Sequence, residues 1–271
     1  MKFRKIAAAL GAVVLAVSLA ACGSSSGGSG GDKTLKIGIK FDQPGLGFKN
    51  ADGTFSGFDV DMARYIAKGL GYDADHIQFV EAVSANRETF LKDGTVDMIL
   101  ATYSITPERK QEVDFAGPYY VAGQDLLVNA DNTSITGPQS LNGKKLCSVT
   151  GSDSAQYVKD HFAKNVQLQE FDTYSKCITA LQGGQIDAVT TDDIILAGFA
   201  QQSPGKFKVL GKPFTKENYG VGLPKGSKDR AKINDLIEAS FKDGTWAKAF
   251  NDNLGKSGYK LPATPPTIDR Y

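Results

Sequence analysis

The sequence is poor in the side chains that most often carry covalent or metal chemistry. It contains two histidines, His76 and His161, and three cysteines among 271 residues. His76 lies beside a turn and His161 in a predicted helix, and neither is near a motif. No nucleophile paired with a base and no cluster of metal ligands stands out, so we expect no metal and no cofactor. Aspartate and glutamate are plentiful, which leaves acid–base chemistry by carboxylates open.

The sequence also lacks an excess of either charge. It has 31 lysines and arginines against 30 aspartates and glutamates, for a formal net charge of +1. Binding to nucleic acid depends on a clustered positive charge. The balance therefore gives no electrostatic reason to expect a nucleic-acid partner.

The main apolar run is at the start of the chain, at residues 6–21, after a basic stretch at residues 2–5. It is too short and wrongly flanked for an ordinary membrane span, and is typical of an export signal. It closes with Leu-Ala-Ala-Cys-Gly at 19–23, which resembles the lipobox of bacterial lipoproteins. We expect a signal peptide at 1–21 and an acylated Cys22. The alternative is an ordinary secretory signal followed by a chance cysteine.

A serine- and glycine-rich stretch follows Cys22 up to residue 32 and is typical of a flexible tether. A lipid at Cys22 and a tether at 22–32 predict a globular domain held at the outer face of the cell membrane. The remaining residues, 33–271, are enough for two domains of ordinary size.

Two cysteines, Cys147 and Cys177, remain in the exported part of the chain. An even number of cysteines in an exported protein predicts a disulfide. Closing a loop of about 30 residues would stabilise the fold by roughly 3–4 kcal/mol. The alternative is a pair of reduced, buried cysteines.

Predicted strands and helices alternate along the chain in two series. The first begins with an alternating strand at 35–39, and the second begins at 141–149 after a polar stretch. Matching turns at 93–97 and 183–187 lead to a strand in each series. Two α/β lobes with strand ends facing each other would form a cleft, where ligands usually bind.

The sequence Ser-Ile-Thr-Pro-Glu-Arg at 104–109 follows an apolar run and predicts a helix start beside that cleft. Thr106 suits the N-cap and Pro107 the first helical position. Free backbone N–H groups there favour an anion, and Arg109 offers a planar fork for a carboxylate. The alternative is an ordinary helix cap with a surface arginine.

Several motifs together make the chain resemble extracytoplasmic solute-binding proteins of ABC importers, in the polar amino-acid family. The motifs are at 57–61, 104–109, 113–115, 118–120, 187–189, 192, 219–220 and 243–246. Within the family, residues 40–45 and 85–87 are most similar to actinobacterial glutamate-binding lipoproteins.

The resemblance implies an α/β fold of the type II periplasmic-binding-protein class. Two lobes would be joined by hinge strands near 119–123 and 215–219. Lobe 1 would comprise residues 33–120 and 219–271, and lobe 2 residues 121–218.

The resemblance also implies a site for a free amino acid. Arg109 would bind the α-carboxylate, and Asp192 the α-ammonium group. Amide, hydroxyl and carbonyl groups from both lobes would form further hydrogen bonds to the amino acid. They belong to Thr102, Ser104, Ser152 and Asp153. Charges of opposite sign at both ends of the zwitterion offset its loss of water. The alternative for Asp192 is a helix N-cap.

Some positions depart from the family pattern. Lys40 stands where many members have aspartate, and Leu46 and Ser84 stand where many have aromatic rings. Lys40 and Arg87 lack an evident structural partner in the sequence, and a distal carboxylate of the ligand would provide one. The alternative is two solvated surface cations.

Two further positions bear on the ligand. Thr191 stands where glutamine binders have histidine, and Tyr103 belongs either to the pocket or to the core. The leading hypothesis is therefore a monomeric, lipid-anchored receptor for L-glutamate that serves an ABC permease and is not an enzyme. Aspartate, glutamine or asparagine as ligand, a dehydratase-like enzyme on the same fold, and a sensory module are the alternatives.

Overall fold

The computed structural model describes residues 34–271, so Cys22, the signal and the tether lie outside the described residues. The described chain contains two five-stranded sheets and one three-stranded sheet. Within residues 34–271, no helix has the length and apolar character needed to cross a membrane.

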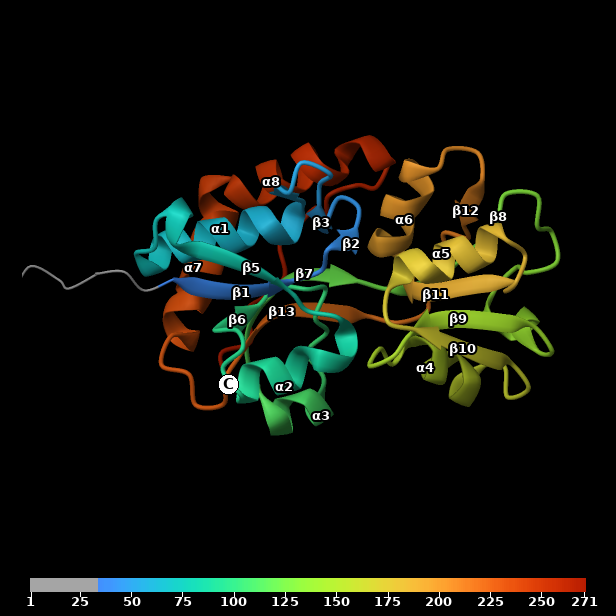
Figure 1. Ribbon diagram of the computed structural model, residues 1–271, viewed down its shortest axis with the longest axis horizontal. Helices are drawn as coiled ribbons and strands as arrows, with labels where there is room; N and C mark the ends of the chain where they lie inside the picture. Colours follow the sequence, from blue (N-terminus) through green and yellow to red (C-terminus); the bar gives the residue numbers. More distant parts are fainter. Residues whose placement is uncertain (1–33) are drawn as a thin grey trace, which may run out of the picture. The chain divides into compact units, whose positions relative to one another are not determined.

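The first sheet is mixed, with strand order β5-β1-β6-β13-β7 (Figure 1). Its strands are β1 (Leu35–Ile39), β5 (Ile77–Glu81), β6 (Met98–Ile99), β7 (Asp114–Ala122) and β13 (Glu217–Leu223). Strands β5 and β6 pair in parallel with β1, and β13 runs antiparallel to β6 and β7.

The helices that accompany this sheet are α1 (Phe58–Leu70), α2 (Arg87–Lys92), α3 (Pro107–Glu112), α7 (Arg230–Asp243) and α8 (Thr245–Leu254). Helices α1, α7 and α8 contact one another, and α7 packs on β7.

The second sheet has strand order β10-β9-β11-β8-β12. Its strands are β8 (Gln124–Asn129), β9 (Lys145–Val149), β10 (Gln167–Phe171), β11 (Ala188–Asp192) and β12 (Phe207–Val209). Its helices are α4 (Ser154–His161), α5 (Tyr174–Gln182) and α6 (Asp193–Gln202). The two sheets with their helices are the two lobes of a type II periplasmic-binding-protein fold, which confirms the predicted fold class.

The sequence pattern missed four short strands, although β6, which also has two residues, lies in the apolar run that precedes residue 104. They are β12 and the small sheet of β2 (Asp42–Gln43), β3 (Gly47–Lys49) and β4 (Phe55–Ser56). Four short 3-10 turns complete the described elements: η1 (Ala74–His76), η2 (Ser84–Asn86), η3 (Pro138–Leu141) and η4 (Gly255–Ser257). Strands of two or three residues carry no measurable alternation, which explains why the sequence did not indicate them.

The chain passes between the sheets at two neighbouring points. Strand β7 ends at Ala122 and β8 begins at Gln124, while Glu217 of β13 pairs with Ala122. The amide of Gln124 donates to Oγ1 of Thr215 at 2.9 Å, which ties the two crossings together. These crossings fall in the two predicted hinge segments. The lobe boundaries at residues 120 and 218 stay a prediction.

A disulfide joins Cys147 of β9 to Cys177 of α5, with their Cα atoms 5.8 Å apart. Both residues are buried. The alternative of two reduced cysteines is therefore wrong. The bond fixes α5, and with it Tyr174 at the start of that helix, to the strand that leads into the polar pocket described below.

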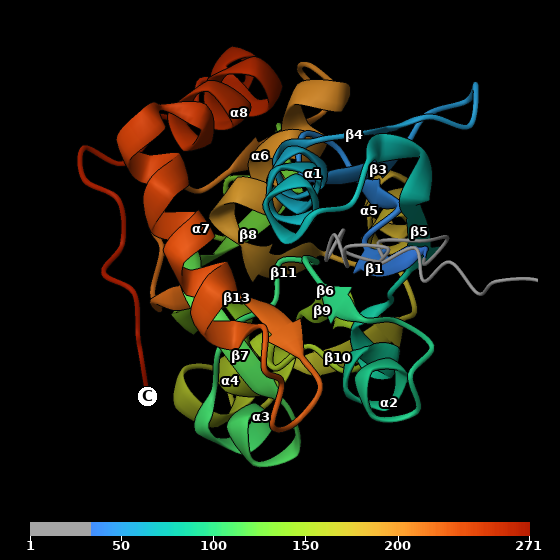
Figure 2. The same ribbon diagram turned by 90° about the vertical axis from the view of Figure 1, so that its left-hand side faces the viewer.

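After η4 the chain is irregular and runs beside α7 (Figure 2). The amide of Asp269 donates to the carbonyl of Gly117 on β7 at 2.7 Å. Arg270 forms ion pairs with Asp235 and Glu238 of α7. These contacts hold the end of the chain on the first lobe.

Candidate functional site

A small polar pocket lies between the two lobes. Its walls come from loops and helix starts at the carboxyl ends of strands in both sheets. The lining residues are Ser84, Arg87, Thr102, Ser104, Arg109, Ser152, Asp153, Ser154, Tyr174, Thr191, Asp192 and Ile195. Most of the residues predicted for the ligand site therefore lie together.

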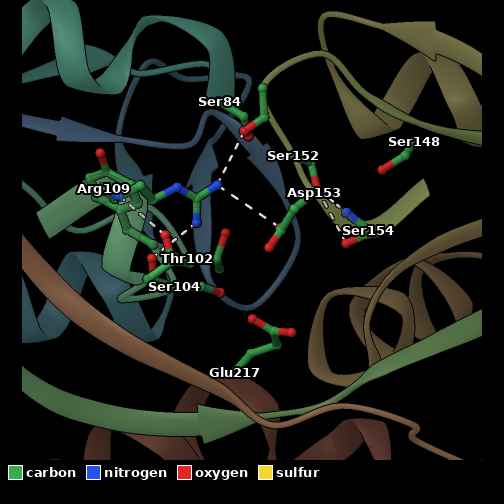
Figure 3. Close-up of polar contacts among 12 residues, drawn as sticks. Ser84, Thr102, Ser104, Arg109, Ser148, Ser152, Asp153, Ser154 and Glu217 are labelled. Carbon is green, nitrogen blue, oxygen red and sulfur yellow. Dashed lines mark hydrogen bonds and ion pairs between the residues drawn. The ribbon is translucent and has the colours of Figure 1, made fainter. Parts of the chain in front are cut away.

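Arg109 is held at this pocket by the start of α3. Thr106 is the N-cap, and its hydroxyl accepts a hydrogen bond from the amide of Arg109 at 3.2 Å. The guanidinium group donates to the carbonyl oxygens of Ser104 at 3.0 Å and Gly151 at 3.2 Å, and lies 4.0 Å from Asp153 (Figure 3). The side chain is 12% exposed. The predicted cap is confirmed, and the alternative of a surface arginine is wrong.

Thr102 has an unusual backbone for a β-branched residue, with φ at +45°. Its amide donates to Oδ2 of Asp59 at 3.0 Å, and its hydroxyl donates to Oε1 of Gln43 at 3.2 Å. The hydroxyl of Tyr119 donates to the other oxygen of Asp59 at 2.8 Å. Asp59 lies in the first turn of α1, where its charge complements the N-terminus of that helix. It also holds Thr102 in this strained conformation.

Lys40 and Arg87 are both buried, at 4% and 2% exposure, so the alternative of solvated surface cations is wrong. Both reach Ser84, since Lys40 Nζ donates to its hydroxyl at 2.8 Å and Arg87 Nε to its carbonyl at 3.3 Å. Burial, and next the charge of Arg87, holds the pKa of Lys40 well below its usual value. Burial and the neighbouring Arg109 lower the pKa of Arg87 to about 10.

No carboxylate oxygen in the described chain lies within 4.0 Å of the charged nitrogens of Lys40 or Arg87. Arg87 is instead hydrogen-bonded to backbone carbonyls, including that of Gly151 in the second lobe at 3.4 Å. Lys40 does not line the polar pocket itself. It lines a second pocket together with Asp42, Glu81 and other residues of both lobes. Buried cations without an acidic partner are rare, and they mark this end of the site.

Tyr103 lies beneath the two arginines and does not line the pocket. Its ring centroid is 4.2 Å from the guanidinium carbon of Arg87 and 5.3 Å from that of Arg109. Its hydroxyl donates to Glu88 at 2.6 Å, and its ring packs against Phe115. Tyr103 is thus a core residue that supports both cations through cation–π contacts.

Asp192 ends β11 at the N-cap position of α6, yet its side chain makes no capping hydrogen bond. Asp192 thus occupies the N-cap position that the alternative gave it, but its carboxylate does not cap the helix. The hydroxyl of Tyr219, on β13, donates to its carboxylate. Burial, and next the nearby carboxylate of Glu217, raises the pKa of Asp192 well above its usual range.

Several residues at the site were missed in the sequence. They are Ser154, Tyr174, Ile195 and Glu217, together with Ser84 as a polar lining residue. The hydroxyl of Tyr174 donates to Oγ of Ser152 at 3.2 Å and lies 3.4 Å from Oγ of Ser148. Of these residues, only Ser154 could have been expected from the sequence, because it follows the predicted site residue Asp153. The others lie in segments that contain no predicted site residue next to them.

The fold and the polar interlobe pocket define a two-lobed binding protein. Residues 35–256 match the family of bacterial extracellular solute-binding proteins, family 3, and the chain belongs to that family.

Named relatives include the glutamate-binding protein GluB of Corynebacterium glutamicum, which is 46% identical over 281 aligned positions. That alignment covers 97% of this chain and 95% of the relative. The ABC transporter glutamine-binding protein GlnH of Bacillus subtilis is 38% identical, covering 86% of this chain and 91% of its own length. A solved ancestral arginine-binding protein bound to glutamine is 36% identical with a TM-score of 0.77, covering 83% of this chain and 99% of that structure. These proteins are named for the amino acids they bind.

Proposed function

We propose that this protein is an extracytoplasmic receptor that binds L-glutamate between its lobes and delivers it to the permease of an ABC importer. The observation that carries the ligand is the pair of buried cations, Lys40 and Arg87, gathered on Ser84 without an acidic partner in the described chain. The similarity to GluB over nearly the whole chain supports the same ligand.

The chemistry of Ser84 favours a distal carboxylate on the ligand. Its hydroxyl oxygen accepts from Lys40, so its own proton is free to be donated to a ligand oxygen in the pocket. Lys40 and Arg87 repel each other in a site with little water, and a carboxylate would relieve that repulsion. The uncharged amide of glutamine would leave both cations without a counter-charge.

The two ends common to all amino acids fit the rest of the pocket. The α-carboxylate would take the place of the Gly151 carbonyl on Arg109, with the hydroxyl of Ser152 and the amides of Ser104 and Asp153 as further donors. The amide of Ser152, which the resemblance also implied, instead donates to the carbonyl of Val149 at 3.0 Å. The α-ammonium group would bind Asp192, with the Thr102 carbonyl and the Ser104 hydroxyl as further acceptors. Oppositely charged partners at each end offset the cost of removing the zwitterion from water.

Calorimetric titration with glutamate, aspartate, glutamine and asparagine at one ionic strength tests this proposal. We expect tight one-to-one binding of glutamate, and a loss of roughly 10- to 100-fold for Lys40→Met, the range for a hydrogen bond to a charged group. Glutamine binding should change little. Lys36→Met, the same change at an exposed lysine of β1, is the control.

Arg109→Ala should abolish binding of every amino acid. An equal loss for glutamate and glutamine in Lys40→Met would contradict the role of Lys40 in selecting the ligand. If the wild type prefers glutamine, glutamate is not its ligand. Glutamine is the second candidate because of the similarity to GlnH.

We also propose that the protein acts as a monomer attached to the outer face of the membrane by an acylated Cys22. The sequence around residue 22 supports this attachment. Replacing Cys22 by alanine should move the protein from the membrane fraction to the medium. Unchanged membrane association of that variant would reject the lipid anchor.

A further inference from the structure

Tyr219, on β13, is fully buried and does not line the polar pocket, yet its hydroxyl reaches a residue that does. The hydroxyl donates to Oδ2 of Asp192, at the end of β11. Strand β13 belongs to the first sheet and β11 to the second (Figure 1). This hydrogen bond therefore joins the two sheets at the place where the α-ammonium group of the ligand is proposed to bind.

The carboxylate of Asp192 has few other contacts that could orient it. It makes no capping hydrogen bond to α6. Arg87 and Arg109 line the same pocket, but within residues 34–271 no lysine, arginine or histidine nitrogen lies within 4.0 Å of this carboxylate. In that part of the chain Tyr219 is its hydrogen-bond donor, and Oδ1 has none. The torsion that turns an aspartate carboxylate has broad minima, so the Tyr219 hydroxyl determines how the group is oriented.

The backbone of Tyr219 holds the segment that carries the opposite end of the proposed site. Ser104 and Tyr219 form an antiparallel bridge. Two backbone hydrogen bonds between residues 103–105 and 218–220, of 2.8 and 2.9 Å, flank this bridge. The carbonyl of Ser104 in turn accepts from the guanidinium group of Arg109 at 3.0 Å. Tyr219 therefore connects, through its main chain and its side chain, the groups proposed to bind the two ends of an amino acid.

The packing of its ring gives Tyr219 a fixed position from which to act. The ring lies against those of Tyr119 and Tyr120, with centroids 6.2 and 5.9 Å away. In an α-amino acid the ammonium and carboxylate groups are attached to one carbon, so the two groups that bind them need a fixed spacing. Such spacing is best maintained when packing and a second layer of hydrogen bonds hold the binding side chains.

We propose that Tyr219 is a positioning residue that sets the spacing between Asp192 and the segment of Ser104 and Arg109, and so makes the site selective for the α-ammonium group. Its hydroxyl holds Oδ2 of Asp192, and Oδ1 receives the ammonium group of the ligand. This inference rests on the proposed placement of that group at Asp192. It does not depend on the side chain of the bound amino acid.

Calorimetric titration of the whole protein and of Tyr219→Phe tests this role. The variant should bind glutamate and glutamine roughly tenfold more weakly, the lower end of the range for a hydrogen bond to a charged group, because this bond also exists before the ligand binds. Glutarate, which is glutamate without its ammonium group, should bind both proteins equally. Selectivity for glutamate over glutarate should therefore fall roughly tenfold in the variant.

Tyr65→Phe is the matched control. It removes a tyrosine hydroxyl that also donates to an aspartate, Asp243, at 2.8 Å, and neither residue lines the pocket. This variant should bind all three compounds as the wild type does. A crystal structure of the wild type with its bound amino acid gives a second measurement, which needs no variant. It should show the Tyr219 hydroxyl on one oxygen of Asp192 and the ammonium group on the other.

Three results would overturn the proposal: wild-type affinity for glutamate and glutamine in Tyr219→Phe, an equal loss for glutarate, or a liganded structure in which Tyr219 does not contact Asp192. An equal loss for glutarate would show that Tyr219 supports the whole site and not the ammonium end. Failure of the wild type to bind any amino acid would reject the proposed function as well. A tenfold loss in a protein that prefers glutamine would support Tyr219 and reject only glutamate as the ligand.

Discussion

Single buried charges in this protein both shape the site and lower the stability of the fold. Asp59 is the clearest case, because its carboxylate accepts hydrogen bonds from the Thr102 amide and the Tyr119 hydroxyl while fully buried. These bonds hold Thr102 at a positive φ, and strain of this kind is usually maintained where function requires it. Burial outweighs the hydrogen bonds and raises the pKa of Asp59 to about 6.

This shift predicts a pH dependence of stability. The folded-state pKa near 6 is above the ordinary value of 3.8, so folding favours protonated Asp59. Its contribution is fully present below about pH 4 and is lost as pH rises through 6, by about 3 kcal/mol in total. Asp59→Asn should remove this decline. Urea unfolding between pH 4 and 8 gives the difference from the wild type.

Other buried acids, such as Asp192, have raised pKa values as well, so the comparison between variants matters more than the wild-type curve alone. Asp75→Asn, at an exposed position of η1, serves as the control and should follow the wild type. If Asp59→Asn shows the same slope as the wild type between pH 4 and 6, the assignment to Asp59 is wrong.

Short elements with well-defined ends place the ligand-binding side chains. Helix α3 has six residues, too few for an isolated helix to be stable in water. Its cap at Thr106, Pro107 in the first turn and the packing of α3 on β7 therefore determine where Arg109 lies. The sequence could predict this arrangement because cap, proline and arginine are within four positions of one another.

Removing the cap hydroxyl should therefore affect stability and binding together. We expect Thr106→Val to cost about 1 kcal/mol of stability, as the loss of an N-cap usually does. Affinity should fall several-fold for every amino acid that binds, since Arg109 serves the common α-carboxylate. Denaturant unfolding and calorimetry measure the two effects.

Thr106→Ser keeps the hydroxyl and should behave like the wild type in both measurements. A loss in Thr106→Val that is confined to glutamate would show that α3 positions a different part of the ligand.

Across the whole molecule, the lobes contact each other directly around the pocket. The amide of Ser175 on α5 donates to Asp42 of the first lobe at 3.0 Å. A Cβ atom on Gly198 of α6 would lie 2.2 Å from the carbonyl oxygen of Pro44, in the loop between β2 and β3. The described conformation is therefore one in which the lobes are closed on each other.

Gly198→Ala should oppose this closure. Its new methyl group cannot fit against the rigid carbonyl of Pro44, so the closed conformation becomes less populated. Affinity should fall by about tenfold if the free energy of closure becomes about 1.4 kcal/mol less favourable, and by more if the loss is larger. Selectivity among amino acids should not change. The unliganded protein should be as stable as the wild type or slightly more so, because alanine favours a helix.

Calorimetry and thermal unfolding check both parts. Gly255→Ala is the matched control, since a Cβ atom there has its nearest neighbour at 4.0 Å and the backbone is helical with φ at −56°. Wild-type affinity in Gly198→Ala would show that this contact does not limit closure.

The sequence predicted the parts of the fold and site that depend on local chemistry. The helix at Pro107, the strand at Leu35–Ile39 and the disulfide between Cys147 and Cys177 follow from caps, alternation and cysteine count. It missed Tyr174 and Glu217, because nothing in their own segments distinguishes them from ordinary helix and strand residues.

What the sequence determined by itself was the α/β class, the family motifs and the placement of Arg109, all of which arise from residues close in the chain. Only the tertiary structure decided that Lys40 and Arg87 are buried with no acidic partner in residues 34–271, and that the Tyr219 hydroxyl donates to Asp192. Lys40 and Ser84 are 44 positions apart, yet their side chains are 2.8 Å apart. Burial and charge pairing depend on distances through space, and these are set when the two sheets and their connecting strands come together.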